Sequence, residues 1–534
     1  MKKLFYNGQV ITADKANSVH QAVMVEDGKI VFVGSTHKSL RYIDDETETI
    51  DLCGCAILPG FIDCHIHMAV AEAQSGKEIQ LDGENGAKTA AELLTKIENA
   101  AKDTVQGEWI VGSSYNHEQL KEARHITKAE LDEVAPNNPV ILVHKSGHLS
   151  VCNSAAFELV KKEGVTLPEE HIGKDKEGNE TGLLKETAHF MMLEKTPLLP
   201  DDEVLISGIE RFCKKMIRAG ITSSHDAGGF GTSTYRSLQK AKDLGVLKNR
   251  VYTMLWTLFG KDAQVENANN AMKMGFHTGF GDDMLKIGPL KIMADGSTVG
   301  GTCATFEPIL TKGELYPTTF SQKELDEIFV EAHKKGFQLT AHAAGDKAIE
   351  LVLNSYEKAM KEYPRKDPRH RLEHCFLCPE RFMPRIKELG VLPIPNPGFI
   401  SDWGGVFEKY YGDRIENVIP LKTFEEYGIV TPFGSDAMVI DKFEPLFCIA
   451  AAMDRLDLSS GTVICEKQQI DLMRAIKGYT IFGAYASFEE NIKGSIEVGK
   501  LADLIVLSEP ILNKTPDQIR KISVAKTYLD GECV

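Results

Sequence analysis

Nine short apolar runs, rich in Val, Ile and Leu, alternate along the chain with helix-like segments. This alternation predicts α/β structure, with parallel strands that helices close into a barrel or cover on both faces. The predicted strands are residues 56–63, 109–113, 221–225, 251–256, 285–293, 337–341, 371–375, 391–395 and 429–434. A parallel α/β barrel has eight strands, so one run is misassigned or belongs to an insertion.

Both ends of the chain have a different texture. Residues 3–35 form short β segments separated by turns, and the same pattern returns at 494–507 and 522–531. The hairpin signals are Asn7-Gly8, Asp27-Gly28 and Asp530-Gly531. Two fragments this short can hardly form separate cores, so we expect the termini to pair into one composite β-sandwich.

These patterns predict a domain organisation. Residues 1–57 and 490–534 form the sandwich, and residues 58–489 form the barrel domain. Gly-, Asn- and charge-rich stretches make about 115–200 the least regular part of the barrel domain. We expect this part to be an insertion over the mouth of the barrel.

Composition narrows the classes of partner. Lys and Arg number 61 against 77 Asp and Glu, a net charge of −16, which disfavours nucleic acid and anionic membranes. No stretch approaches the ~20 apolar residues of a membrane span, and the N-terminal apolar run is too short for a signal peptide, so we expect a cytoplasmic protein. Eleven scattered cysteines indicate reduced thiols. The CxxC pair Cys375 and Cys378 lacks the second pair that a structural zinc site needs.

Six side chains that can bind or bridge metal ions stand at or near the ends of the apolar runs. They are His65, His67, Lys291, His342, His374 and Asp436. Parallel α/β barrels concentrate their chemistry at the carboxyl ends of their strands. Folding would therefore assemble these residues into one metal site.

His65 and His67 form an HxH motif at the end of a predicted strand. Side chains alternate along a strand, so both imidazoles and Asp63 share one face while Ile66 points the other way. Two imidazoles at this spacing can bind one cation. The alternative is a pair of strand-end histidines that are satisfied by hydrogen bonds.

Lys291 lies in the apolar run 287–293, where burial of an unpaired ammonium is costly. A lowered pKa would let the neutral amine take up carbon dioxide, and the resulting carbamate could bridge two divalent metals. The alternative is a side chain that extends to solvent.

His342 and His374 each end an apolar run and are expected to bind a second cation, although either could be a structural histidine. Asp436 follows the last run. A carboxylate beside a metal and its water can act as the general base and return the proton to the leaving amine.

Substrate contacts are expected from the insertion and the barrel loops. The candidates are His148, Glu186, Ser297 and Thr302. The segments around His117 and His144 also lie in the insertion, and they either contact substrate or form a solvated loop.

In the six residues and the motifs around them, the chain resembles the amidohydrolase superfamily, and within it the YtcJ-like branch that includes N-substituted formamide deformylase. The motifs that match are residues 58–67, 144–153, 181–186, 291–297, 342–348, 371–374, 434–436 and 494–503. The resemblance implies a distorted (β/α)8 TIM barrel beside a composite β-sandwich formed from both termini.

The resemblance also implies roles for the six side chains. His65, His67, His342 and His374 would bind metal, Lys291 would be a bridging N6-carboxylysine, and Asp436 would be both ligand and general base. The predicted protein is an amidohydrolase that holds one or two divalent ions, with zinc as the expected metal. It cleaves a non-peptide C–N bond by metal-activated hydroxide. Its substrate would be a small amide, N-acyl, N-formyl or cyclic amide compound.

Two alternatives remain at this point. One is a mononuclear deaminase of an amino-heterocycle, which needs no carboxylated lysine. The other is a catalytically inactive scaffold or regulatory binding protein, which has no need of all six residues. The sequence leaves open whether the chain forms a homo-oligomer.

Overall fold

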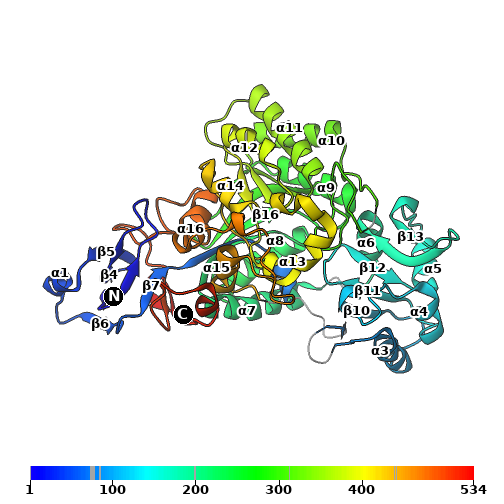
Figure 1. The fold of residues 1–534 in the computed structure, drawn as a ribbon, viewed down its shortest axis with the longest axis horizontal. Helices are drawn as coiled ribbons and strands as arrows, with labels where there is room; N and C mark the ends of the chain where they lie inside the picture. Colours follow the sequence, from blue (N-terminus) through cyan, green and yellow to red (C-terminus); the bar gives the residue numbers. More distant parts are fainter. Residues whose placement is uncertain are drawn as a thin grey trace.

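The structure is a computed structural model that describes residues 2–534 apart from 73–77, 83–85, 198–199, 312, 438 and 441. A barrel occupies the centre, the strands from the two termini lie at one end, and a separate sheet lies at the other (Figure 1). Residues 198–199 of the predicted insertion fall outside the described residues.

The central sheet has seven strands in the order β20-β19-β18-β17-β16-β15-β8, and neighbouring strands are all parallel. They are β8 (Phe61–Ile66), β15 (Ile221–Asp226), β16 (Arg250–Leu255), β17 (Leu285–Met293), β18 (Leu339–Ala343), β19 (Arg371–His374) and β20 (Leu392–Ile394). The sheet is a nearly closed barrel of the predicted TIM type.

The predicted strand at 429–434 forms no regular ladder but occupies the eighth position of the barrel. Phe433 O accepts a hydrogen bond from Cys64 N at 2.9 Å, and Gly434 N donates to Pro395 O at 3.2 Å. The segment therefore lies between β8 and the end of β20. A Cβ at Gly434 would lie 2.4 Å from the Cβ of His65, so the close approach requires glycine.

The apolar run at 109–113, one of the nine strands predicted for eight barrel positions, belongs to a different sheet. This mixed sheet has the order β13-β14-β12-β11-β10-β9 and spans residues 79–185. Its strands are β9 (Ile79–Gln80), β10 (Ile110–Tyr115), β11 (Val140–His144), β12 (Leu149–Cys152), β13 (Ile172–Lys174) and β14 (Glu180–Lys185), and its helices are α3 (Ala90–Asp103), α4 (Lys128–Val134), α5 (Ser154–Lys162) and α6 (Glu186–Leu193). The separate sheet therefore begins before residue 115, the expected start of the insertion. The boundaries of the domains stay a prediction.

Helices cover the barrel. They include α2 (Met68–Ala71), α7 (Asp202–Arg218), α8 (Thr232–Asp243), α9 (Gly260–Lys273), α10 (Gln322–Lys334), α11 (Asp346–Glu362), α12 (Met383–Leu389), α13 (Gly398–Tyr411), α14 (Leu421–Glu426), α15 (Pro445–Asp454), α16 (Leu472–Gly478) and α17 (Ile481–Ala486). Helix α10 begins with a capping box between Ser321 and Glu324. It buries Leu325, Ile328 and Phe329, which recur at helical spacing and face the strands.

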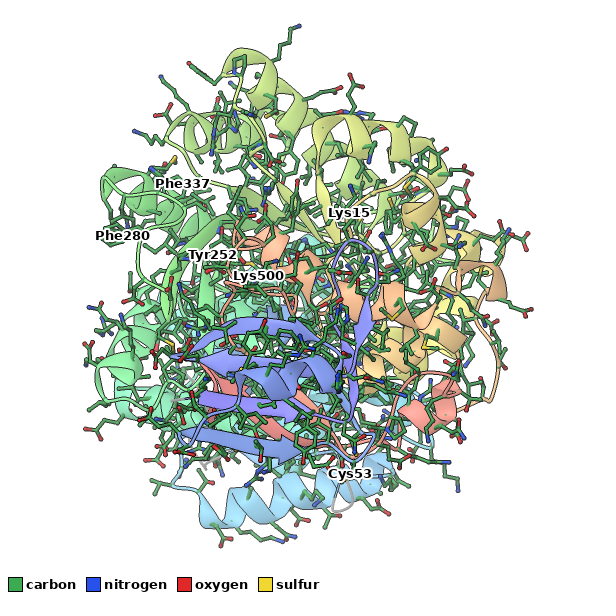
Figure 2. All side chains as sticks on the ribbon, turned by 90° about the vertical axis from the view of Figure 1, so that its left-hand side faces the viewer. Lys15, Cys53, Tyr252, Phe280, Phe337 and Lys500 are labelled. Carbon is green, nitrogen blue, oxygen red and sulfur yellow. The ribbon has the colours of Figure 1, made fainter. Side chains whose placement is uncertain are left out.

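The termini together form two sheets with a shared core. One has the order β5-β4-β1-β6 and the other β23-β22-β21-β7-β2-β3. Their strands are β1 (Lys2–Tyr6), β2 (Gln9–Ile11), β3 (Val19–His20), β4 (Ala22–Glu26), β5 (Lys29–Gly34), β6 (Thr47–Asp51), β7 (Ala56–Pro59), β21 (Leu504–Leu507), β22 (Val524–Leu529) and β23 (Glu532–Cys533), with the short helices α1 (Thr36–Ser39) and α18 (Pro516–Ile519). Figure 2 shows this end of the molecule, with Cys53 and Lys500 labelled. Phe5 and Tyr528 pack edge to face at 5.0 Å, which joins the two ends of the chain as predicted.

No helix in the described ranges is long and apolar enough to cross a membrane. All eleven cysteines are free thiols. Cys375 and Cys378 are buried, and they belong to no group of three potential metal ligands among the residues that the structure describes.

A buried ion pair fastens the terminal sheets to the barrel. Arg250, the first residue of β16, donates from Nε and Nη2 to both carboxylate oxygens of Asp503, at 2.7 and 3.0 Å. Its Nη2 also donates to Asp530 Oδ1 at 2.6 Å. The side chains of Arg250 and Asp503 are 4% and 5% exposed, so solvent screens their attraction little.

We predict that Asp503→Asn lowers the free energy of unfolding by about 3 kcal/mol, because removing one partner of a buried pair leaves the other poorly compensated. The exposed pair of Lys521 and Asp517 supplies the control. Asp517→Asn should leave stability unchanged, since exposed pairs contribute little. Thermal or urea unfolding measures both variants, and equal effects would contradict the prediction.

Candidate active site

A cavity of about 330 Å³ lies at the carboxyl ends of the barrel strands. All six side chains predicted for the metal site line it: His65, His67, Lys291, His342, His374 and Asp436. They come from β8, β17, β18, β19 and the segment that closes the barrel. The fold therefore brings together residues that are spread over most of the sequence.

The tightest cluster consists of His65, His67 and Asp436, whose potential ligand atoms lie within 4.8 Å of one another. Asp436 Oδ1 is 3.7 Å from His65 Nε2 and 3.6 Å from His67 Nε2. The backbone of Asp436 has a left-handed φ of 58°, and its N–H donates to His65 O at 2.7 Å. This unusual backbone conformation turns the carboxylate toward β8, where the HxH spacing has placed both imidazoles.

His374 and His342 adjoin this cluster. The ring of His374 lies 4.7 Å from that of His65 and 4.5 Å from that of His342, measured between centroids. A second group of imidazoles thus lines the same cavity, although only His65, His67 and Asp436 meet the closer spacing among the described residues.

Each imidazole is held by an acceptor, which assigns its tautomer. The four donations are His65 Nδ1 to Glu373 Oε2 at 2.5 Å, His67 Nδ1 to Gly228 O at 2.8 Å, His374 Nδ1 to Asn396 Oδ1 at 2.7 Å, and His342 Nε2 to Gly296 O at 3.0 Å. The opposite ring nitrogen of each histidine keeps its lone pair. His65 Nε2 is buried and has no hydrogen-bond partner in the structure.

Burial shapes the protonation of the site. It lowers the pKa of His67 and of His342 to about 3, and it lowers those of His65 and His374 well below their usual range. Burial also raises the pKa of Asp436 to about 6. Neutral imidazoles together with a carboxylate are the donor set that zinc and similar divalent cations prefer, and here the lone pairs of His65 and His67 face Asp436. The orphaned His65 Nε2 gives the same indication, so these residues fit a divalent metal.

Lys291 is buried, and the alternative that it extends to solvent is wrong. Its Nζ donates to Ala227 O at 3.1 Å and lies 4.4 Å from the centroid of the Trp256 ring. Burial lowers the pKa of Lys291 to about 8. A useful fraction of the amine is therefore neutral near physiological pH.

The four predicted substrate contacts also lie together. Glu186 Oε2 accepts from His148 Nδ1 at 2.8 Å, and Glu186 Oε1 accepts from Thr302 Oγ1 at 2.5 Å. Thr302 Oγ1 in turn accepts from Ser297 N at 2.9 Å. His148 and Ser297 line the cavity, while Glu186 and Thr302 stand behind them. The ring of His148 lies 5.4 Å from that of His342.

The separate sheet contributes further to the wall. His144, at the end of β11, lines the cavity, and His117 contacts it from behind through a 3.3 Å approach of Nδ1 to His144 Nε2. The wall also has a large apolar part that the sequence did not reveal. Its members include Phe190, Trp256, Leu258 and Met293, which pack as one cluster.

Sequence reasoning also missed the acceptors that hold the histidines. Glu373 stands inside the Arg-Leu-Glu-His run at 371–374, and Gly228 belongs to a glycine cluster that is weak as a phosphate-loop signal. A charged residue inside a buried strand was the available signal for Glu373. No signal in the sequence marked Asn396.

A TIM barrel with a buried cluster of histidines and a carboxylate at its carboxyl mouth defines a metal-dependent hydrolase. Comparison with known proteins gives the family. Residues 48–534 match the model of the amidohydrolase family, so the chain belongs to it. Membership confirms the prediction of an enzyme that acts on carbon–nitrogen bonds other than peptide bonds.

The relatives cover the chain from end to end. N-substituted formamide deformylase of Arthrobacter pascens is 28% identical over 99% of this chain and 97% of that protein. The putative amidohydrolase YtcJ of Bacillus subtilis is 28% identical over 100% and 99%. An uncharacterized metal-dependent hydrolase from Pyrococcus horikoshii superposes with a TM-score of 0.72, at 22% identity over 97% of this chain and 98% of that one.

Proposed function

We propose that the protein hydrolyses the C–N bond of a small amide, with formamides and other N-acyl or cyclic amides as the substrate class. The observation that carries this proposal is the convergence of His65 Nε2 and His67 Nε2 on the Asp436 carboxylate. His342 and His374 complete the ligand set. A bound zinc ion would lower the pKa of its water toward ~7 and polarise the substrate carbonyl.

Asp436 serves as the general base. Because burial raises its pKa to about 6, the carboxylate is ionised near neutral pH yet basic enough to accept a proton from the attacking water. The same oxygen can then deliver that proton to the departing nitrogen, which leaves as a neutral amine. Its place between the two imidazoles holds it beside the reacting centre.

Lys291 would carry a carbamate, whose two oxygens would help to hold two divalent ions. Its neutral Nζ attacks carbon dioxide, the N–C bond forms, and the amine releases one proton to solvent. The pKa of about 8 supports this reaction, since an ordinary lysine offers far less neutral amine. The product is an anion with two oxygen ligands in place of a buried cation.

The cavity wall favours a substrate with an uncharged, apolar substituent. Phe190, Trp256 and Leu258 supply a continuous apolar surface beside the site. The ammonium of Lys145, at the cavity edge, lies 3.3 Å from Asp82 Oδ2. A carboxylate on the substrate would have to compete for that ammonium. The similarity to a deformylase of N-substituted formamides supports the same choice.

His148 orients the substrate. Its Nδ1 is turned to Glu186, so its other nitrogen faces the cavity. Glu186 and Thr302 fix the ring through the short hydrogen bond between them, and Ser297 anchors Thr302.

A mononuclear deaminase is the second candidate, because the closest ligand cluster among the described residues consists of His65, His67 and Asp436. Such an enzyme does not need Lys291. The third reading, an inactive scaffold, has no use for a complete set of buried ligands.

We predict about two divalent ions per chain in protein purified without chelator and with bicarbonate. Lys291→Ala should retain at most one ion and lose activity on an amide and formamide panel, because the bridging anion is gone. Elemental analysis and amine release measure both. Lys323→Ala, which changes an exposed lysine, is the control. One ion per chain in both the wild type and Lys291→Ala, with no amine released from the panel, would favour the deaminase.

We also predict that Leu258→Ala lowers kcat/KM about tenfold for formamides with propyl or larger apolar N-substituents, and much less for N-methylformamide. A lost apolar contact of this size is worth about 1–3 kcal/mol in discrimination. Leu244→Ala, at a 66% exposed position, is the matched control. Equal losses on all substrates would contradict the apolar subsite.

A further inference from the structure

Glu373 occupies the centre of the barrel directly behind the metal site. It is fully buried, and it comes one residue before His374 on β19. Consecutive strand residues normally face opposite sides, yet Glu373 bonds to His65 and the ring of His374 lies 4.7 Å from the same imidazole. The left-handed φ of His374, 66°, makes this double approach to His65 achievable.

We propose that Glu373 is a positioning residue that fixes the tautomer of His65 and thereby sets the affinity of the site for metal. This inference rests on the proposed metal site. It adds a residue that does not touch the metal or the substrate and acts only through His65.

Hydrogen-bond accounting assigns the proton. Glu373 Oε1 accepts from Thr340 Oγ1 at 2.5 Å and from Arg371 Nε at 2.8 Å. Glu373 Oε2 accepts from Arg371 Nη2 at 3.1 Å and lies 2.5 Å from His65 Nδ1. A carboxylate has about four acceptor sites, which these four contacts fill, and the Arg371 guanidinium that bonds both oxygens stabilises its ionised form. The His65 contact is therefore a donation from Nδ1–H, which leaves the lone pair on Nε2.

Among the four proposed ligand histidines, His65 is distinguished by the charge of its acceptor. The acceptors of His67, His342 and His374 are a backbone carbonyl, a second backbone carbonyl and an asparagine amide. Hydrogen bonds to a carboxylate are roughly twice as strong as those between neutral groups. A carboxylate behind a ligand histidine also makes its free nitrogen a better metal donor.

The guanidinium of Arg371 holds the carboxylate in place. Its Nη2 donates to Cys64 O at 2.6 Å, next to His65 in the chain, and its Nη1 donates to His225 Nδ1 at 2.9 Å. Buried ion pairs of this kind add little stability compared with apolar residues of the same size. The direct contact with a proposed metal ligand supplies a role that stability alone does not.

The decisive variant is Glu373→Gln. The glutamine amide has one oxygen, so its NH2 group takes either the Oε1 position, beside Thr340 and Arg371 Nε, or the Oε2 position, beside His65 and Arg371 Nη2. In the first orientation His65 keeps an acceptor, but that acceptor loses its negative charge. In the second, the NH2 group donates to Nδ1 and forces the proton to Nε2, where it blocks the metal. We expect the apoprotein to bind zinc 10- to 100-fold more weakly, measured by competition with a chromogenic chelator.

Thr340→Val is the matched control, because it removes another donor to the same carboxylate and keeps the His65 contact. Its zinc affinity should stay within about threefold of wild type. Near-ultraviolet circular dichroism and thermal unfolding of the apoproteins show whether each variant folds. Unchanged zinc affinity in a folded Glu373→Gln protein would overturn the proposal. Wild-type protein that binds no zinc would instead refute the proposed function.

A second measurement decides the matter if Glu373→Gln fails to fold. Nitrogen-15 NMR of selectively labelled wild-type apoprotein, with His65 assigned by comparison with His65→Gln, reports which ring nitrogen carries the proton. Protonated Nδ1 and unprotonated Nε2 support the proposal, and the reverse overturns it.

Discussion

The ion pair between Arg371 and Glu373 is the interaction on which the geometry of the barrel interior depends. Sheet order places β19 near one edge of the sheet and β8 at the other, so no backbone ladder joins them. The side chains of the pair instead cross the interior and bond to Cys64 O and His65 on β8 and to Thr340 on β18. Both charges are fully buried, so neither can be kept without the other. This mutual requirement fixes the distance between the strands that carry the histidines.

The segment 429–436 closes the barrel, and its irregular backbone has a steric cause. A regular strand at 429–436 would alternate its side chains between two faces, and a side chain at position 434 would collide with His65. Glycine permits the close approach, and the left-handed backbone at Asp436 then directs the carboxylate to the imidazoles. Strained backbone at such a point is typical of functional sites, because packing on both sides compensates its cost. The distortion of the barrel is therefore part of how the site is built.

The sequence predicted the parts of the site that follow from local pattern. Strand alternation places His65 and His67 on one face, and the ends of apolar runs mark His342 and His374, so six cavity residues could be named without a structure. The acceptors of the histidines could not be named, because Glu373 and Asn396 meet them only after folding. Periodicity also could not separate the run at 109–113, which forms β10 in another sheet, from the barrel strands. An apolar run reports that a strand is buried and not which sheet buries it.

The barrel and the separate sheet contribute different parts of the cavity. The barrel supplies every proposed metal ligand, whereas His148 and Phe190 reach the same cavity from the segment that carries the separate sheet. Glu186 joins the two parts, because it accepts from His148 on one side and from Thr302 of the barrel loop on the other. Its backbone has a left-handed φ of 44°, a strained conformation of the kind that clusters at functional sites. Changes in the separate sheet can therefore alter the wall of the cavity while the ion pair behind His65 keeps the geometry of the histidine cluster.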